Sequence, residues 1–101
     1  MIVKHIVMWR LKEPTSGSSK EEVARSFKLR LEALPQVIPE IRYYEVGLNL
    51  KDSERAADVV LYSEFDSLEA LASYSLHPAH LEVVELVREI AAESRVVDYE
   101  T

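Results

Sequence analysis

The stretch that decides the fold runs from residue 58 to residue 82 and reads DVVLYSEFDSLEALASYSLHPAHLE. Its pattern predicts a strand, a turn, a short helix, a break and the start of a second helix. Pro78 causes the break, because its ring fixes φ, removes a backbone N–H and disfavours a helical conformation at His77. Tyr74 lies one turn before this break and His80 lies just after it. We therefore expect the two side chains to converge at the junction between the helices.

Segments with strand character lie on both sides of this stretch. Residues 2–11, 41–50 and 95–100 are rich in β-branched and aromatic side chains, as is the segment 57–65, and this composition is typical of strands. A short polar link at 51–55 separates the second strand from the third. These two strands are therefore expected to form an antiparallel hairpin.

Helical periodicity predicts which side chains face the core. A helix is expected to begin after Ser19, which has capping-box spacing to Glu22, and to end near Pro35. Its apolar stripe contains Val23, Phe27, Leu31 and Leu34. The buried side of the helix before the break is expected to contain Leu68, Leu71 and Ala72. The helix after the break has a broad apolar side that includes Leu81, Val83, Val84, Leu86, Val87, Ile90 and Ala91.

The order strand, helix, strand, strand, split helix, strand is that of an α+β, ferredoxin-like βαββαβ fold. Such a fold has one four-stranded antiparallel sheet with its helices on one face. We expect residues 1–101 to form a single domain. The first strand is apolar on both faces, with Ile6 and Met8 on one and Val7 and Trp9 on the other. A homodimer formed through the sheet face opposite the helices would cover the second apolar face.

Composition excludes several classes of function. The formal net charge of −6 opposes binding to nucleic acid and to anionic membranes. Cysteine is absent, so disulfides, thiolate metal sites and cysteine nucleophiles are excluded. We expect a cytoplasmic protein, because the chain shows neither a signal-peptide pattern nor an apolar run long enough to cross a bilayer. Without a glycine-rich phosphate loop or a nucleophile motif, no nucleotide cofactor is expected.

The histidines and Tyr74 allow three interpretations. His80 could act as a general base near a helix N-terminus, which favours neutral imidazole, with Tyr74 donating a hydrogen bond to an enolate oxygen. Alternatively, His77 caps the helix and His80 fills a hydrogen-bonding niche near the dimer interface. A metal site is the third interpretation, with His77, His80 and His5 as ligands and Glu64 as a carboxylate partner. Histidines at this spacing are common by chance, so neither a metal nor another cofactor is expected.

Several motifs together resemble the stress-responsive α/β barrel family, also called Dabb, within the dimeric α+β barrel superfamily. They are VKHIVMWRLK at 3–12, LP at 34–35, DVVLYSEFDSLEALASY at 58–74, HPAH at 77–80 and RVVDYE at 95–100. The resemblance implies a cytosolic homodimer whose two sheets pack face to face around a cavity. Most members of the family have no assigned activity.

One branch of this family, the plant polyketide cyclases that form olivetolic acid, is similar at YSLHPAH, residues 74–80, with Ser75 as a departure. This similarity implies catalytic roles for Tyr74 and His80 and a place in the cavity lining for His5. The candidate substrate-binding residues are His5, His77, Trp9 and Tyr62, with packing as the alternative for the two aromatic side chains. Two functions remain open: a noncatalytic dimer that binds a small ligand, and a cofactor-free enzyme acting on a polyketide-like or other carbonyl compound.

Overall fold

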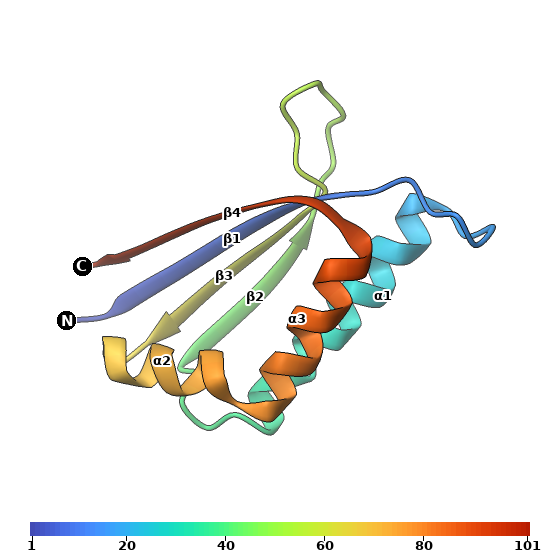
Figure 1. The fold of residues 1–101 in the computed structure, drawn as a ribbon. Coiled ribbons are helices and arrows are strands. Elements are labelled where there is room, and N and C mark those ends of the chain that lie inside the picture. Colours follow the sequence, from blue (N-terminus) through green and yellow to red (C-terminus); the bar gives the residue numbers. More distant parts are fainter.

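The computed structural model describes residues 1–101 as one four-stranded antiparallel sheet and three α-helices (Figure 1). The elements are β1 (Val3–Leu11), α1 (Lys20–Glu32), a 3₁₀ turn (Leu34–Gln36), β2 (Tyr43–Leu48), β3 (Val59–Phe65), α2 (Leu68–Leu76), α3 (Pro78–Ile90) and β4 (Ala91–Glu100). The strand order is β2-β3-β1-β4. This arrangement confirms the ferredoxin-like prediction. No helix has the length and apolar character that crossing a bilayer requires.

The helices cover one face of the sheet, with α1 and α3 side by side (Figure 1). Alternate side chains of β1, among them Val3, Val7 and Trp9, point into the core under the helices and are almost fully buried. Phe27 and Leu31 of α1 close this core from the other side. Alternation along the strands therefore sends the intervening side chains to the opposite face.

That opposite face carries exposed apolar side chains. Ile6 pairs with Tyr62 of β3 on one side and with Val97 of β4 on the other, and Met8 lies beside Val60. Met8, Val60 and Val97 are 45%, 37% and 51% exposed. We call this face, defined by these five residues, the open face. No element of the chain covers it.

The predicted starts of α1 and α3 are confirmed, and each is determined by residues next to it in the sequence. The Ser19 hydroxyl accepts a hydrogen bond from the backbone N–H of Glu22, whose carboxylate accepts one from the backbone N–H of Ser19. Pro78 is the first residue of α3, and His77 before it is extended, with φ −62° and ψ 136°. The chain therefore turns between α2 and α3 as the proline predicted.

Three burial predictions and one boundary were wrong. Leu68 and Leu81 are 61% and 47% exposed, and Ala72 is also exposed. Leu71 and Tyr74 are the buried residues of α2, because this short helix lies at the end of the sheet and presents only a narrow stripe to it. Strand β4 begins at Ala91, four residues before the expected start, so Ala91 lies in this strand and not on the last helix as predicted. Pairing with β1 overrides the weak strand propensity of the first residues of β4.

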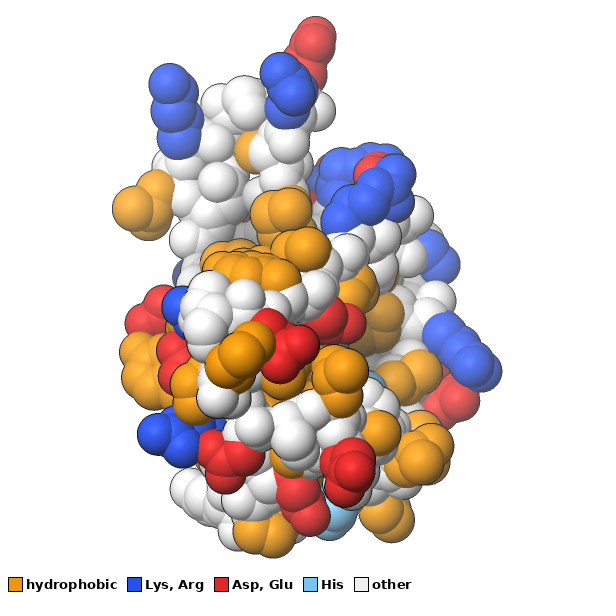
Figure 2. Space-filling view, turned by 90° about the vertical axis from the view of Figure 1, so that its left-hand side faces the viewer, with side chains coloured by type: hydrophobic (Ala, Val, Ile, Leu, Met, Phe, Trp, Pro, Cys, Tyr) orange, Lys and Arg blue, Asp and Glu red, His pale blue; other side chains and the backbone are white.

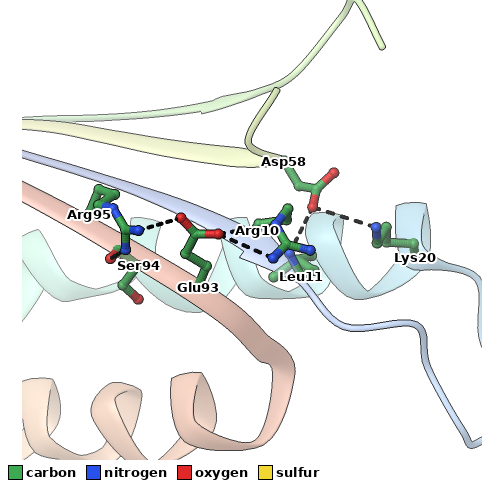
Figure 3. Close-up of polar contacts among 7 residues, drawn as sticks. All are labelled: Arg10, Leu11, Lys20, Asp58, Glu93, Ser94 and Arg95. Carbon is green, nitrogen blue, oxygen red and sulfur yellow. Dashed lines mark hydrogen bonds and ion pairs between the residues drawn. The ribbon is translucent and has the colours of Figure 1, made fainter. Parts of the chain in front are cut away.

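Ion pairs and one partly buried acceptor hold the end of β1 in place (Figure 3). A carboxylate oxygen of Asp58 accepts a hydrogen bond from the backbone N–H of Leu11 at 2.7 Å and lies 3.8 Å from the Lys20 ammonium. On β4, Glu93 pairs with Arg10 of β1 (3.1 Å). The loop between β2 and β3 projects from the molecule beside this region and carries charged side chains at its tip (Figure 2).

Candidate functional site

A cavity of about 200 Å³ lies between the sheet and α3. Its lining is mainly apolar and comes from all three helices and from β1, β3 and β4, and its polar members are His5, Tyr74, Ser75, His80 and Ser94. Three hollows are larger: two of about 380 Å³ and 610 Å³ lie against α1, and one of about 220 Å³ lies beside Met8 and Arg10 of β1. None of the three contains a histidine. The cavity between the sheet and α3 is therefore the candidate site.

His80 is held in the first turn of α3 with a defined tautomer. Its Nδ1 lies 3.0 Å from the backbone carbonyl oxygen of Ser75. A carbonyl oxygen can only accept a hydrogen bond, so Nδ1 carries the proton and Nε2 of the neutral ring keeps its lone pair. Burial lowers the pKa of His80; the hydrogen bond to Ser75 opposes this shift, and repulsion from His5 adds to it when His5 is protonated. At neutral pH His80 is therefore a hydrogen-bond acceptor and a competent base.

Tyr74 lies in the last turn of α2 and is 1% exposed. Its ring lies against that of His80, with centroids 4.4 Å apart, and its hydroxyl is 2.7 Å from the hydroxyl of Tyr44 on β2. Burial raises the pKa of Tyr74 to about 12, with the hydrogen bond from Tyr44 acting in the opposite direction. Burial also raises the pKa of Tyr44 far above its ordinary value. Both phenols are therefore neutral, and the pair retains a hydroxyl hydrogen to donate.

His5 enters the cavity from the middle of the sheet. It faces Asp98 across the β1–β4 pairing, and its Nδ1 lies 2.5 Å from a carboxylate oxygen of Asp98. A carboxylate oxygen accepts hydrogen bonds, so Nδ1 of His5 is the donor. The His5 ring also meets Tyr74 edge to face, with centroids 6.0 Å apart. Three elements thus bring His5, Tyr74 and His80 to one cavity.

The other candidate residues lie in different environments. Trp9 lines the cavity and packs edge to face on Phe27, with centroids 4.8 Å apart. His77 is not part of the lining, and its Nδ1 accepts a hydrogen bond from the backbone N–H of Ala79 as the cap of α3. Tyr62 lies on the open face, where its hydroxyl donates to Glu64 at 2.6 Å. Substrate binding by His77 and Tyr62 stays a prediction, at places outside this cavity.

The metal interpretation finds no matching cluster. No group of three His, Asp or Glu side chains is placed to hold one ion. Glu64 pairs with Lys4 in register and so lies on the opposite face of the sheet from His5, and His77 uses Nδ1 as a helix cap. These residues do not fit a shared metal ion.

Sequence reasoning missed three partners of the site residues: Asp98, Tyr44 and the Ser75 carbonyl. Asp98 could have been found from strand pairing, because β1 and β4 are antiparallel neighbours and their register places residue 98 opposite His5. That register is set by the whole sheet. No local motif marks it.

The fold and this cavity define a ferredoxin-like protein with a candidate small-molecule site. The chain is similar to the crystal structure of a dimeric protein of unknown function and ferredoxin-like fold from Bacteroides fragilis, with 39% identity, a TM-score of 0.83 and coverage of 99% of this chain and 96% of that one. The model of the Stress responsive A/B Barrel Domain, Dabb, matches residues 3–101. The chain belongs to the Dabb family, which confirms the resemblance found in the sequence.

Two curated relatives span nearly the same length. An uncharacterised protein of Streptomyces coelicolor is 31% identical over 99 residues, covering 98% of this chain and 99% of the relative. Olivetolic acid cyclase of Cannabis sativa is 25% identical over 101 residues, covering 98% of this chain and 96% of the cyclase. The protein is therefore a Dabb-domain protein of unassigned activity, with a cyclase among its relatives.

Proposed function

We propose that this protein binds a small, largely apolar organic molecule in the cavity between the sheet and α3. The observation that carries the proposal is the convergence of His5, Tyr74 and His80, from three different elements, on one apolar cavity. Small-molecule sites combine such a lining with a few convergent polar groups. A dry cavity of about 150 Å³ is known to hold benzene. The 200 Å³ present here therefore suit a molecule with a single ring.

Trp9 provides a direct test, because it is the only tryptophan of the chain and it lines the cavity. A panel of single-ring ketones and phenols is titrated while tryptophan fluorescence and the melting temperature are followed. Saturable changes in both are expected for compounds that enter the cavity. A panel that changes neither would contradict the proposal.

A cavity-filling variant shows where a compound binds. Val96 lines the cavity yet is 57% exposed, so Val96→Phe fills part of the space with little disturbance to the core. Val37, 54% exposed and outside the lining, gives the matched control Val37→Phe. Binding should be lost in the first variant and kept in the second. Equal binding by both would place the compound elsewhere and contradict the proposal.

A second candidate function is proton transfer on a carbonyl compound, favoured by the contact between His80 and Tyr74. His80 offers an unprotonated Nε2, and Tyr74, whose ring packs on that of His80, has a neutral hydroxyl. Removal of a proton next to a carbonyl needs such a base together with a donor to the enolate oxygen. The similarity to olivetolic acid cyclase supports chemistry of this class.

Exchange of α-protons for deuterium tests this second function without a known substrate. A small ketone that binds in the cavity is incubated with the protein in heavy water and followed by proton NMR. Loss of a general base costs on the order of 10²-fold or more in rate, so His80→Ala should abolish the protein-dependent exchange. Leu29→Ala, at an exposed position of α1 outside the cavity lining, should leave it unchanged. A folded His80→Ala protein with full exchange activity would exclude His80 as the base.

We also propose that the homodimer forms through the open face. Its apolar side chains are exposed in the isolated chain, and the similar protein from Bacteroides fragilis is described as dimeric. Sedimentation equilibrium should give twice the chain mass of 11.6 kDa. Met8→Lys, in the middle of this face, should give a monomer, whereas Leu29→Lys on the exposed side of α1 should not. A monomeric wild-type protein would contradict the proposal.

A cytoplasmic location is proposed from the composition of the chain. Cysteine-free chains suit a reducing compartment. Cell fractionation followed by immunodetection would test this location, and recovery of the protein outside the cytoplasmic fraction would contradict it.

A further inference from the structure

In both histidines of the cavity, Nδ1 lies within hydrogen-bond distance of an oxygen that can only accept a hydrogen bond. Nδ1 of His5 meets a carboxylate oxygen of Asp98, and Nδ1 of His80 meets the carbonyl oxygen of Ser75. Each Nδ1 must therefore carry a hydrogen. A neutral imidazole has only one N–H, so both Nε2 atoms keep a lone pair.

The two Nε2 atoms are also free of protein partners. Neither makes a hydrogen bond within the chain, whereas every fully buried side-chain nitrogen or oxygen has a partner. Both Nε2 atoms are therefore accessible, and both residues line the cavity. A molecule in the cavity meets two hydrogen-bond acceptors in a mainly apolar environment.

We infer that Asp98 and the Ser75 carbonyl make the cavity selective for molecules that donate hydrogen bonds, such as phenols and enols, over molecules that only accept them. In this assignment Asp98 is a specificity-determining residue, because it fixes the tautomer of His5 without lining the cavity itself. The inference rests on the proposed function, since it names the class of ligand for the same cavity.

The physical reason is the cost of an unpaired acceptor. An ether or ester placed in the cavity gives neither Nε2 atom a partner, although both lose water when the ligand enters. A hydroxyl group pairs with at least one of them. Leaving a desolvated acceptor unpaired weakens binding by roughly tenfold or more. Sites built around such pairing therefore discriminate strongly against analogues that lack it.

Phenol and anisole provide the matched pair of probes, because they differ only by replacement of the hydroxyl hydrogen with a methyl group. Their affinities are measured by NMR titration at about pH 8, where unperturbed imidazole is neutral. Phenol should bind at least about tenfold more tightly than anisole. In the free protein, the ¹⁵N shifts of His5 and His80 should show the Nδ1–H tautomer.

Two variants separate the role of Asp98 from a general effect of charge. Asp98→Ala removes the acceptor from His5, so the Nε2–H tautomer should appear at His5 and the preference for phenol should decrease. Glu100→Ala removes a carboxylate from the same strand and the same sheet face without touching His5. It should change neither the tautomer nor the preference. Thermal unfolding confirms that both variants are folded.

The outcomes distinguish this inference from the proposed function. Equal binding of phenol and anisole, or an Nε2–H tautomer at His5 in the wild-type protein, would overturn the inference while leaving the cavity as a binding site. An unchanged His5 tautomer in folded Asp98→Ala would overturn the role of Asp98. If neither compound binds, the proposed function fails, and the tautomers of the free protein still decide whether Asp98 and Ser75 fix the two rings.

Discussion

The hydrogen bond between Tyr44 and Tyr74 gives the sharpest prediction about stability. The two hydroxyl oxygens are 2.7 Å apart, and one comes from β2 while the other comes from α2. Tyr74→Phe and Tyr44→Phe each remove one hydroxyl and keep the ring. Each single change therefore leaves the remaining hydroxyl in a buried environment without its partner.

The structure predicts different sizes for the two effects. An unsatisfied buried hydroxyl costs about 1–3 kcal/mol of the free energy of unfolding. Tyr44→Phe leaves the hydroxyl of Tyr74, a residue that is 1% exposed, without a hydrogen-bond partner. The cost of this variant should therefore lie toward the upper end of this range. Tyr74→Phe leaves the hydroxyl of the less buried Tyr44 without a partner and should lower the free energy of unfolding by less. The double variant removes both polar groups and should be no less stable than the worse single variant.

Urea unfolding of the four proteins completes the double-mutant cycle. The protein concentration must be the same throughout, because the proposed dimer would make stability depend on it. A coupling energy of about 1 kcal/mol or more is expected for a buried pair in contact. The reasoning would be refuted if neither single variant changed the free energy of unfolding. It would also be refuted if the double variant lost as much stability as the two single variants together.

Three further predictions concern local contacts and pH. Asp58→Ala should lower stability by about 1–3 kcal/mol in urea unfolding, because the N–H of Leu11 loses its acceptor; Asp58→Asn keeps an acceptor oxygen, and an equal loss in both variants would contradict this reason. Ser19→Ala should cost about 1 kcal/mol through loss of the α1 cap, so an unchanged melting temperature would count against it. The lowered pKa of His80 means that the unfolded chain binds more protons, so stability should fall as the pH drops below about 6.5. Thermal unfolding of His80→Asn should show a smaller loss of stability at low pH than the wild-type protein does. An equal loss would contradict the assignment of this pH dependence to His80.

The sequence alone predicted those features that depend on neighbouring residues. The capping box at Ser19 and the break at Pro78 each involve residues within a few positions of one another, and both are present. Alternation along β1 likewise predicted two apolar faces, because side-chain direction in a strand follows from position alone. The βαββαβ order then restricts the sheet to few topologies.

Features that depend on tertiary placement were not predictable in this way. Periodicity shows that a helix has an apolar side but not how that side is turned toward the sheet, so Leu68 and Leu81 were assigned to the core although they are exposed. The contact between His5 and Asp98 joins residues 93 positions apart. A shift of one residue in the β1–β4 register would send Asp98 to the open face. The tautomer of His5 thus depends on a register that no short motif reveals.

The break at Pro78 explains how one short segment supplies two of the three polar groups of the site. On an unbroken helix, residues six positions apart differ by about 240° in direction and by about 9 Å along the axis. Tyr74 and His80 would then point away from each other. The extended conformation of His77 redirects the chain, and the two ring centroids lie 4.4 Å apart. The same turn brings Nδ1 of His80 to the carbonyl of Ser75, which belongs to the helix before the break. One proline therefore both aligns the rings and fixes the proton on His80.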